Sequence, residues 1–295
     1  MNYFENFAKY CRPQLNALLN QLEHSKPVST SIIWHLLIEL LSSVKVTVLR
    51  TQPITPPPKF VDLLDNCGQE LNLLSTISTF AGWLLKVQDH FGRNLALKVL
   101  SNERTDSMHA YLTAAIRYVN SHITQYDKKT IVIAVLQYLV KKEMDLAWEA
   151  HSLSAHHKIS RDIPGVVVPA PLPEWSTDRV LAMEWIEGIN VESWKDLATD
   201  YRTEVAQRLL SFHRKAISTT GLLRYDTHLS NLKFMPNGDL TIVDYGSTID
   251  LHKKLLEALP LDTNLESQSL AQVACSWLEN FYNSVQIGIT RTTIG

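Results

Sequence analysis

Two segments decide the fold: Arg224–Asn231, which reads RYDTHLSN, and Leu240–Gly246, which reads LTIVDYG. The turn residues Pro236–Asp239 separate two short apolar runs, and the second run leads into Asp244. An Asn-Gly pair in this turn tolerates the positive φ angles of a tight two-residue connection. The pattern therefore predicts a β-hairpin that brings the first segment close to Asp244.

Polar side chains of both segments would then face one space. Asp226, Asn231 and Asp244 supply two carboxylates and one amide oxygen, a ligand set suited to Mg²⁺ that carries phosphate. Asp-x-x-x-x-Asn followed by Asp-aromatic-Gly is the order of a phosphoryl-transfer loop. Asp226 would orient the acceptor hydroxyl, and Asn231 and Asp244 would hold the metal ions. Either motif alone favours an ordinary turn, whereas the two in this order favour a site.

Composition indicates a globular chain with no bias toward nucleic acid. The 295 residues are 45% hydrophobic and 20% charged, and the formal net charge is -2. This length suits one large domain or two lobes. Because there is no basic stripe and no Cys-x-x-Cys array, we expect no nucleic-acid partner.

Cysteine use and hydropathy favour a cytoplasmic protein. The three cysteines (Cys11, Cys67 and Cys275) are odd in number and far apart, which argues against a disulfide framework. The first residues lack the basic start and apolar core of a signal peptide. The longest apolar runs, Ile32–Leu41 and Ile131–Val140, are too short to span a bilayer. We therefore expect no transmembrane helix, with peripheral membrane association through an interfacial helix as an alternative.

A lysine lies in the middle of an apolar strand. The pattern predicts a strand over Leu95–Leu100 that carries Lys98, within an antiparallel sheet that begins near Thr76. A buried lysine needs an anionic partner, and Glu149, on a long helix predicted over 130–157, is the candidate. An edge-strand lysine in solvent and a solvated helix glutamate are the alternatives.

A second strand, Arg179–Trp185, ends in the turn Ile186-Glu187-Gly188. A strand followed by an acidic residue, an aromatic residue and a glycine suits the hinge between two kinase-like lobes. The backbone there would meet the edge of an adenine ring. A plain strand that ends at a glycine turn is the alternative.

The order of elements predicts an α+β protein with three parts. Residues 1–74 would form an N-terminal helical extension. Residues 75–188 would form an N-lobe with a β-sheet and inserted helices, through the hinge, and residues 189–295 a helical C-lobe with the catalytic and metal-binding loops. Apart from the helix over 130–157 and one that starts near Ser29, helical spacing of apolar residues occurs in five places: 2–23 (divided at Pro13), 59–74, 107–122, 201–218 and 267–285.

Three longer motifs follow one another along the chain: Glu143–Ala150 (EMDLAWEA), Arg179–Gly188 (RVLAMEWIEG) and Asp226–Asn231 (DTHLSN). They are similar to the E-x-D-[FY]-x-x-E-A, R-V-L-x-M-E-x-x-x-G and D-x-H-x-G-N motifs of the UbiB/AarF family of atypical kinases. Leu95–Val99 also looks like the V-A-V-K-V strand of that family. The resemblance covers about residues 76–251, and the first motif is unusual outside the family.

The resemblance implies a two-lobed protein-kinase-like fold with an N-terminal helical extension, and it implies a role for each matched residue. Lys98 would contact the α- and β-phosphates of ATP and pair with Glu149. Met183, Glu184, Trp185 and Ile186 would form the hinge. Asp226 would be the catalytic acid/base. Asn231 and Asp244 would be the ligands of Mg²⁺.

The sequence departs from the family at several positions. The family carries a K-x-G-Q motif in an N-terminal extension that covers the active site, and Lys45–Val48 resembles its setting but lacks Gly-Gln. The alanine-rich nucleotide loop is degraded to Ser75–Gly82. Ser230 replaces the family's glycine before Asn231, and Arg224-Tyr225 replaces the His-Arg pair of ordinary kinases.

The expected function is ATP- and Mg²⁺-dependent phosphoryl transfer or ATP hydrolysis by an atypical kinase, with Asp226 as the catalytic residue. In the resembled family the activity is linked to isoprenoid quinones and lipid membranes, so the expected acceptor is a lipid- or quinone-related molecule or a protein. A small-molecule phosphotransferase of the aminoglycoside or choline kinase type remains an alternative, because it shares the Asp–Asn–Asp arrangement. A nucleotide-binding pseudokinase scaffold is a second alternative, which the degraded loop favours and the complete set of site residues disfavours.

Overall fold

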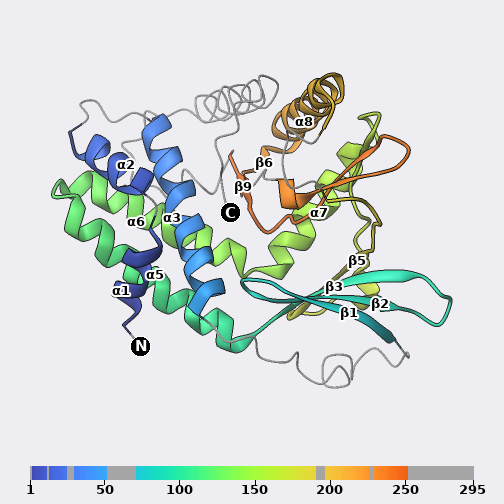
Figure 1. The fold of residues 1–295 in the computed structure, drawn as a ribbon, viewed down its shortest axis with the longest axis horizontal. Helices are drawn as coiled ribbons and strands as arrows, with labels where there is room; N and C mark the ends of the chain where they lie inside the picture. Colours follow the sequence, from blue (N-terminus) through green and yellow to red (C-terminus); the bar gives the residue numbers. More distant parts are fainter. Residues whose placement is uncertain are drawn as a thin grey trace.

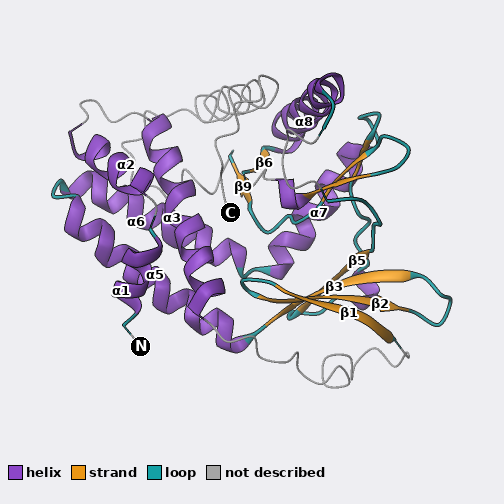
Figure 2. Cartoon of the chain, viewed as in Figure 1, coloured by secondary structure: helices purple, strands orange, loops and turns teal. Residues whose placement is uncertain are grey.

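The computed structural model describes six stretches of the chain: residues 2–11, 13–24, 30–51, 71–190, 197–225 and 229–251 (Figure 1). Three of the predictions fall outside them: the helix over 267–285, most of the helix over 59–74, and Asp226. Within the described residues, helices occur together with mainly antiparallel sheets (Figure 2), which confirms the α+β class.

Five helices gather on one side of the molecule (Figure 1). They are α1 (Tyr3–Tyr10), α2 (Pro13–His24), α3 (Thr30–Thr51), α5 (Asn102–His122) and α6 (Tyr126–Glu143). Pro13 divides the first two, as predicted, because it occupies the first position of α2, where a missing N–H leaves no bond unmade. These helices bury leucines such as Leu19, Leu22, Leu36 and Leu40. Among the described helices, none is long and apolar enough to cross a membrane.

A four-stranded antiparallel sheet lies beside these helices. Its strands are β1 (Asn72–Ser78), β2 (Gly82–Gln88), β3 (Asn94–Leu100) and β5 (Val180–Glu184), in the order β1-β2-β3-β5. Residues 72–74, the end of a helix in the sequence prediction, form the start of β1, because Asn72 and Leu73 pair with the end of β2. The register places Lys98 between Leu84 of β2 and Leu181 of β5. Lys98 is therefore on a central strand and not on an edge strand.

The helix predicted over 130–157 is interrupted, and its second part is α7 (Leu146–Ser160). The break occurs because Asp145 caps α7: its Oδ1 accepts the backbone N–H of Trp148 at 2.8 Å. The cap places Glu149 in the first turn of α7. Since α7 packs against β5, which pairs with β3, this turn lies near the strand that carries Lys98.

The last described part of the chain carries one long helix and several short strands. Its elements are β4 (Val166–Val167), the 3₁₀ helix η1 (Pro173–Trp175), α8 (Thr199–Thr220), β6 (Leu222–Arg224), the 3₁₀ helix η3 (Leu229–Asn231), β7 (Leu232–Phe234), β8 (Leu240–Ile242) and β9 (Thr248–Asp250). β7 and β8 form the predicted hairpin, and Gly238 in its turn has a φ of 87°. β6 pairs with β9. These two pairings bring the segments around residues 224–231 and 240–246 together.

Candidate active site

The sheet, helix α7 and the D-Y-G segment (Asp244–Gly246) meet at one charged cluster. Lys98 of β3 is 7% exposed, and its ammonium donates to both carboxylate oxygens of Glu149, at 2.9 Å to Oε1 and 2.8 Å to Oε2. It also donates to Oδ1 of Asp244 at 3.0 Å. The structure thus brings together three of the predicted site residues, and two carboxylates share one buried ammonium.

Burial and neighbouring charges both shift the pKa values of Lys98 and Glu149. Burial disfavours the Lys98 ammonium, but the carboxylates of Asp244 and Glu149 outweigh it and raise the pKa of Lys98 above its ordinary value. Burial raises the pKa of Glu149 to about 7, with Lys98 opposing this shift and Asp244 adding to it. Lys98 therefore stays charged, and a fixed ammonium suits an anionic ligand.

Gly246 leaves the room that this ion pair needs. A Cβ atom at position 246 would lie 3.1 Å from Oε2 of Glu149 and 3.4 Å from Nζ of Lys98. The Gly246 N–H donates to Oδ1 of Asp244 at 3.4 Å. A side chain at position 246 would crowd the Lys98–Glu149 ion pair, so close packing explains the glycine of the D-Y-G motif.

Asp244 has a φ of 63°, the one positive value among the described non-glycine residues. A non-glycine residue in this region costs about 1–2 kcal/mol. Arg224 holds the backbone on both sides of it: Nε donates to the carbonyl of Asp244 at 2.7 Å, and Nη2 donates to the carbonyl of Val243 at 2.8 Å. The sequence marks Arg224 only as a departure from ordinary kinases. Its contacts were missed because hydrogen bonds to backbone carbonyls leave no residue pattern.

Asn231, the other predicted metal ligand, lies at the end of the loop that contains Asp226. Asn231 is 7% exposed, and its backbone carbonyl accepts a hydrogen bond from the backbone N–H of Val243 at 3.0 Å. This bond ties the end of the loop to the residue before Asp244. Asp226 lies outside the described residues, so its place in the site stays a prediction.

The four predicted hinge residues lie at the end of β5 and just after it, in the sheet that carries Lys98: Met183, Glu184, Trp185 and Ile186. Met183 is buried. The N–H of Glu184 donates to the carbonyl of Ala170 at 2.9 Å, and the N–H of Trp185 to that of Asn94 at 3.2 Å. These two N–H groups are therefore already bonded within the protein.

Glu143, at the end of α6, is a second buried carboxylate, and its charge contributes to the raised pKa of Lys98. Its Oε1 accepts a hydrogen bond from the Tyr225 hydroxyl at 3.0 Å and one from the Ser247 hydroxyl, and it forms an ion pair with Lys45 of α3 at 2.7 Å. Lys45 also donates to the Ser247 hydroxyl at 2.9 Å. The sequence assigned no site role to Glu143 or Lys45. The E-x-D motif and the Lys45–Val48 stretch were the signals that could have identified them.

The loop between β1 and β2 is closed on itself and tied to α5. The N–H of Thr79 donates to the carbonyl of Gly82 at 2.9 Å, and the N–H of Gly82 donates back to the Thr79 hydroxyl at 3.1 Å. Arg104 of α5 is 3% exposed and donates to the Thr79 carbonyl. The ammonium of Lys45 lies 4.7 Å from the centroid of the Phe80 ring. The degraded nucleotide loop therefore faces α3 as well as α5.

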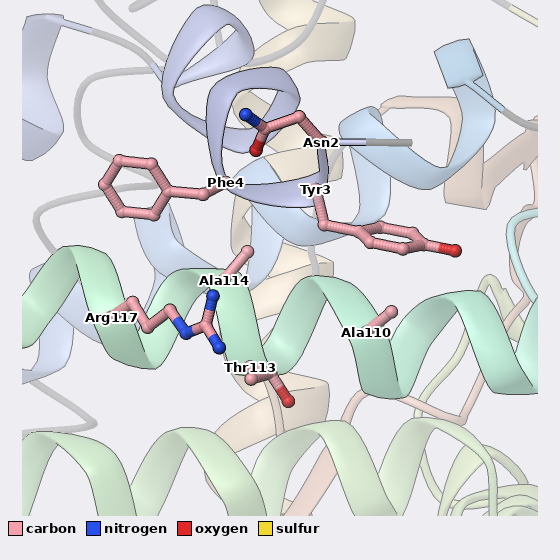
Figure 3. Close-up of a pocket in the computed structure, with 7 residues that line it drawn as sticks. All are labelled: Asn2, Tyr3, Phe4, Ala110, Thr113, Ala114 and Arg117. Carbon is pink, nitrogen blue, oxygen red and sulfur yellow. The ribbon is translucent and has the colours of Figure 1, made fainter.

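A separate hollow of about 530 Å³ lies between α1 and α5 (Figure 3). Tyr3 and Phe4 line it from the first of these helices, and Ala110 and Arg117 line it from the second. None of the predicted site residues lines this hollow, so it does not belong to the candidate active site.

Comparisons with known proteins agree with this geometry. A family model described as the ABC1 atypical kinase-like domain matches residues 86–261. An uncharacterised aarF domain-containing protein kinase of Arabidopsis thaliana chloroplasts is 33% identical over 114 residues, which are 39% of this chain and 16% of that protein. The mitochondrial atypical kinase COQ8 of Saccharomyces cerevisiae is 23% identical over 112 residues, which are 37% of this chain and 22% of that protein. The chain thus matches less than a quarter of the length of either relative.

A solved structure shares the fold. It is the complex of Rv3197 from Mycobacterium tuberculosis with erythromycin, which aligns with a TM-score of 0.56 and 23% identity over 80% of this chain and 64% of that chain. This likeness supports the kinase-like fold that the motifs predicted. Because the family model covers more than half of the sequence, the chain belongs to the ABC1 atypical kinase-like family, the group that includes the UbiB/AarF kinases.

Proposed function

We propose that this chain binds ATP with Mg²⁺ and catalyses transfer or hydrolysis of the γ-phosphate, with Asp226 as the catalytic residue. The observation that carries the proposal is the buried Lys98 ammonium held between Glu149 and Asp244. A fixed positive charge at the junction of sheet and loops is what the phosphates of a nucleotide require. Membership of an atypical kinase family supports the same reaction class.

The donor chemistry fits a magnesium ion. The described residues contain no group of three His, Cys, Asp or Glu side chains that could hold a metal. Asp244 and Asn231 would therefore hold the ion together with phosphate oxygens, an arrangement that Mg²⁺ favours over an all-protein cage. Bound Mg²⁺ would neutralise charge on the transferred phosphoryl group.

The remaining site residues would orient the reactants. Lys98, positioned by Glu149, would bind the α- and β-phosphates, and residues Met183–Ile186 would contact the adenine ring. Asp226 would accept a hydrogen bond from the attacking hydroxyl or water. The acceptor we propose is a lipid- or quinone-related molecule or a protein, and peripheral membrane association would bring a lipid acceptor within reach.

A combined binding and turnover experiment tests the proposal. ATP should raise the melting temperature only when Mg²⁺ is present, because the metal ligands and phosphates complete one site. Asp226→Asn should keep this stabilisation and lose phosphate release by about 100-fold or more, since positioning of the nucleophile is lost. Thermal shift with and without EDTA, and a phosphate-release assay with and without lipid vesicles that contain a quinone-like phenol, supply the measurements. Equal stabilisation in EDTA would contradict the metal role.

A non-catalytic scaffold is the second candidate function. The closed loop over residues 79–82 and the contact between Lys45 and Phe80 favour it, because both engage the degraded nucleotide loop in contacts within the protein. The same experiment separates the two candidates. A scaffold would show ATP-dependent stabilisation without phosphate release, and Asp226→Asn would then change neither quantity.

A further inference from the structure

Arg224 is one of the largest fully buried side chains among the described residues. It ends β6, two positions before Asp226, and pairs with Thr248 of β9. Its guanidinium carbon lies 5.8 Å from the centroid of the Tyr245 ring. A buried cation at this point connects the segment that precedes Asp226 with the D-Y-G segment.

The two hydrogen bonds of Arg224 act on the two peptide groups that flank the Cα atom of Asp244. The carbonyl of Val243 belongs to the peptide group before this Cα atom, and Nη2 binds it at 2.8 Å. The carbonyl of Asp244 belongs to the peptide group after it, and Nε binds it at 2.7 Å. The orientations of these two peptide planes are the backbone angles φ and ψ of Asp244. One planar side chain thus fixes both angles of a residue whose φ is positive.

The guanidinium group is specifically suited to this contact. Its N–H groups form a rigid planar fork, so two acceptors at a fixed separation can be bound at once. A lysine ammonium at the same place could donate, but as a point charge on a flexible stem it could not fix two peptide planes relative to each other. These planes set the direction of the Cα–Cβ bond of Asp244, from which its carboxylate extends toward Lys98.

We propose that Arg224 is a positioning residue that holds the Asp244 carboxylate in the direction needed to bind Mg²⁺. This inference rests on the proposed function, in which Asp244 is a metal ligand. Arg224 itself would touch neither metal nor nucleotide. Its effect would therefore show in the magnesium requirement and in the mobility of the D-Y-G segment.

The test compares Arg224→Lys with the matched control Arg208→Lys. Arg208 of α8 also donates to two backbone carbonyls, those of Gly165 at 3.3 Å and Gly238 at 2.7 Å, but neither belongs to the D-Y-G segment. Two quantities are measured: the Mg²⁺ concentration that gives half of the ATP-dependent stabilisation, and the amide hydrogen exchange of residues 243–247 without ligand. Arg224→Lys should raise the first roughly tenfold, as loss of a residue that orients a metal ligand does, and should speed exchange in that segment. Arg208→Lys should change neither.

The results for Arg224→Lys test the inference separately from the proposed function. A folded Arg224→Lys protein with the wild-type magnesium requirement and wild-type exchange would overturn the inference and leave the proposed function standing. If wild-type protein shows no magnesium requirement, the proposed metal role fails, and exchange of residues 243–247 alone decides whether Arg224 fixes the segment. If Arg224→Lys does not fold, exchange in wild-type protein decides. Residues 243–247 should then exchange only through global unfolding, and rapid local exchange would overturn the inference.

Discussion

Lys98 and Glu149 form the most consequential pair of residues in the molecule, because both are buried and Lys98 is the cation in contact with Glu149, while Lys98 also contacts Asp244. Removal of Lys98 leaves the buried Glu149 carboxylate without its cation, and removal of Glu149 leaves the buried Lys98 ammonium with Asp244 alone. Breaking a buried pair in this way costs up to about 3–5 kcal/mol. We expect Lys98→Met and Glu149→Gln to weaken ATP-dependent stabilisation to a similar extent, and the double variant to be less than additive. Melting temperatures with and without ATP and Mg²⁺ measure this.

An exposed ion pair offers a control for that pair. Lys215 of α8 and Asp162 form an ion pair at 3.8 Å, and their side chains are 43% and 64% exposed. Because solvent screens such a pair, Lys215→Met should change the melting temperature little and leave ATP binding unchanged. Unequal, additive effects of the Lys98 and Glu149 variants would mean that the two residues do not act as a unit.

His156 makes the stability of the fold dependent on pH. It is fully buried, its Nδ1 donates to the carbonyl of Ser152 at 2.7 Å, and burial lowers its pKa from 6.5 to about 4. Below about pH 6.5 the unfolded chain therefore binds a proton at His156 that the folded chain does not bind until the pH is near 4. The free energy of unfolding is thus fully retained above pH 6.5 and falls as the pH drops toward 4. His156 alone should account for a loss of about 2 kcal/mol by pH 5. His213, whose pKa is lowered by burial to about 3, adds to the loss.

Urea unfolding at pH 7.5 and pH 5 measures this loss. His156→Asn keeps a donor but cannot titrate, so the variant should be less stable than wild type at pH 7.5 and lose less stability on acidification. His90→Asn, at an exposed position, should follow the wild type. A steep loss that persists unchanged in His156→Asn would assign the pH dependence to other groups.

The residues differ in how far the sequence could identify them. A lysine in an apolar strand requires an acid, and that requirement leads from Lys98 to Glu149, which the structure places in contact. The roles of both in nucleotide binding stay a prediction, as does the role of Asp226. Arg224 could not be identified in this way, because its partners are main-chain carbonyls that every residue has.

At the scale of elements, α5 and the loop between β1 and β2 are joined by one side chain. Arg104 donates to the Thr79 carbonyl and, at 2.7 Å, to the Ser78 hydroxyl. Arg104→Ala should destabilise the protein by about 1–3 kcal/mol, because buried acceptors lose a charged donor. The loop should then move more freely, so the half-saturating ATP concentration should change as well.

Urea unfolding and ATP titration by thermal shift check both effects. Arg117→Ala on the same helix is the matched control, because Arg117 is exposed and lies at the hollow between α1 and α5. If Arg104→Ala lowers stability without any change in ATP binding, the loop does not take part in nucleotide binding.

Element boundaries were predictable where a capping or breaking residue interrupts the apolar pattern. Pro13 was recognised as such a break, and Asp145 was not, although it caps α7 by the usual bond to the third residue of the helix. The apolar repeat continues from α6 into α7, so periodicity alone joined the two helices. The short strands β6 and β9 were missed as a pair, because three-residue strands carry too few side chains to show a period.

At the scale of the whole molecule, the N-terminal helices and the site form one connected structure. α3 packs against α5 and α6, which lie after the first three strands in sequence. Lys45 then extends from α3 to Glu143 and Ser247 beside the charged cluster. The division into residues 1–74, 75–188 and 189–295 stays a proposal, and these contacts indicate that the first part would not fold independently of the second.

The four-stranded sheet has a further practical consequence at its β1 edge. Leu73 and Ile77 of β1 are 40% and 49% exposed, and among the described strands only β2 pairs with it. An apolar strand with an open edge can add a strand from a neighbouring molecule, which is a route to aggregation. Heating exposes more such surface, so melting would become irreversible and dependent on protein concentration. Thermal measurements on this protein should therefore be repeated at several dilutions before shifts are compared between variants.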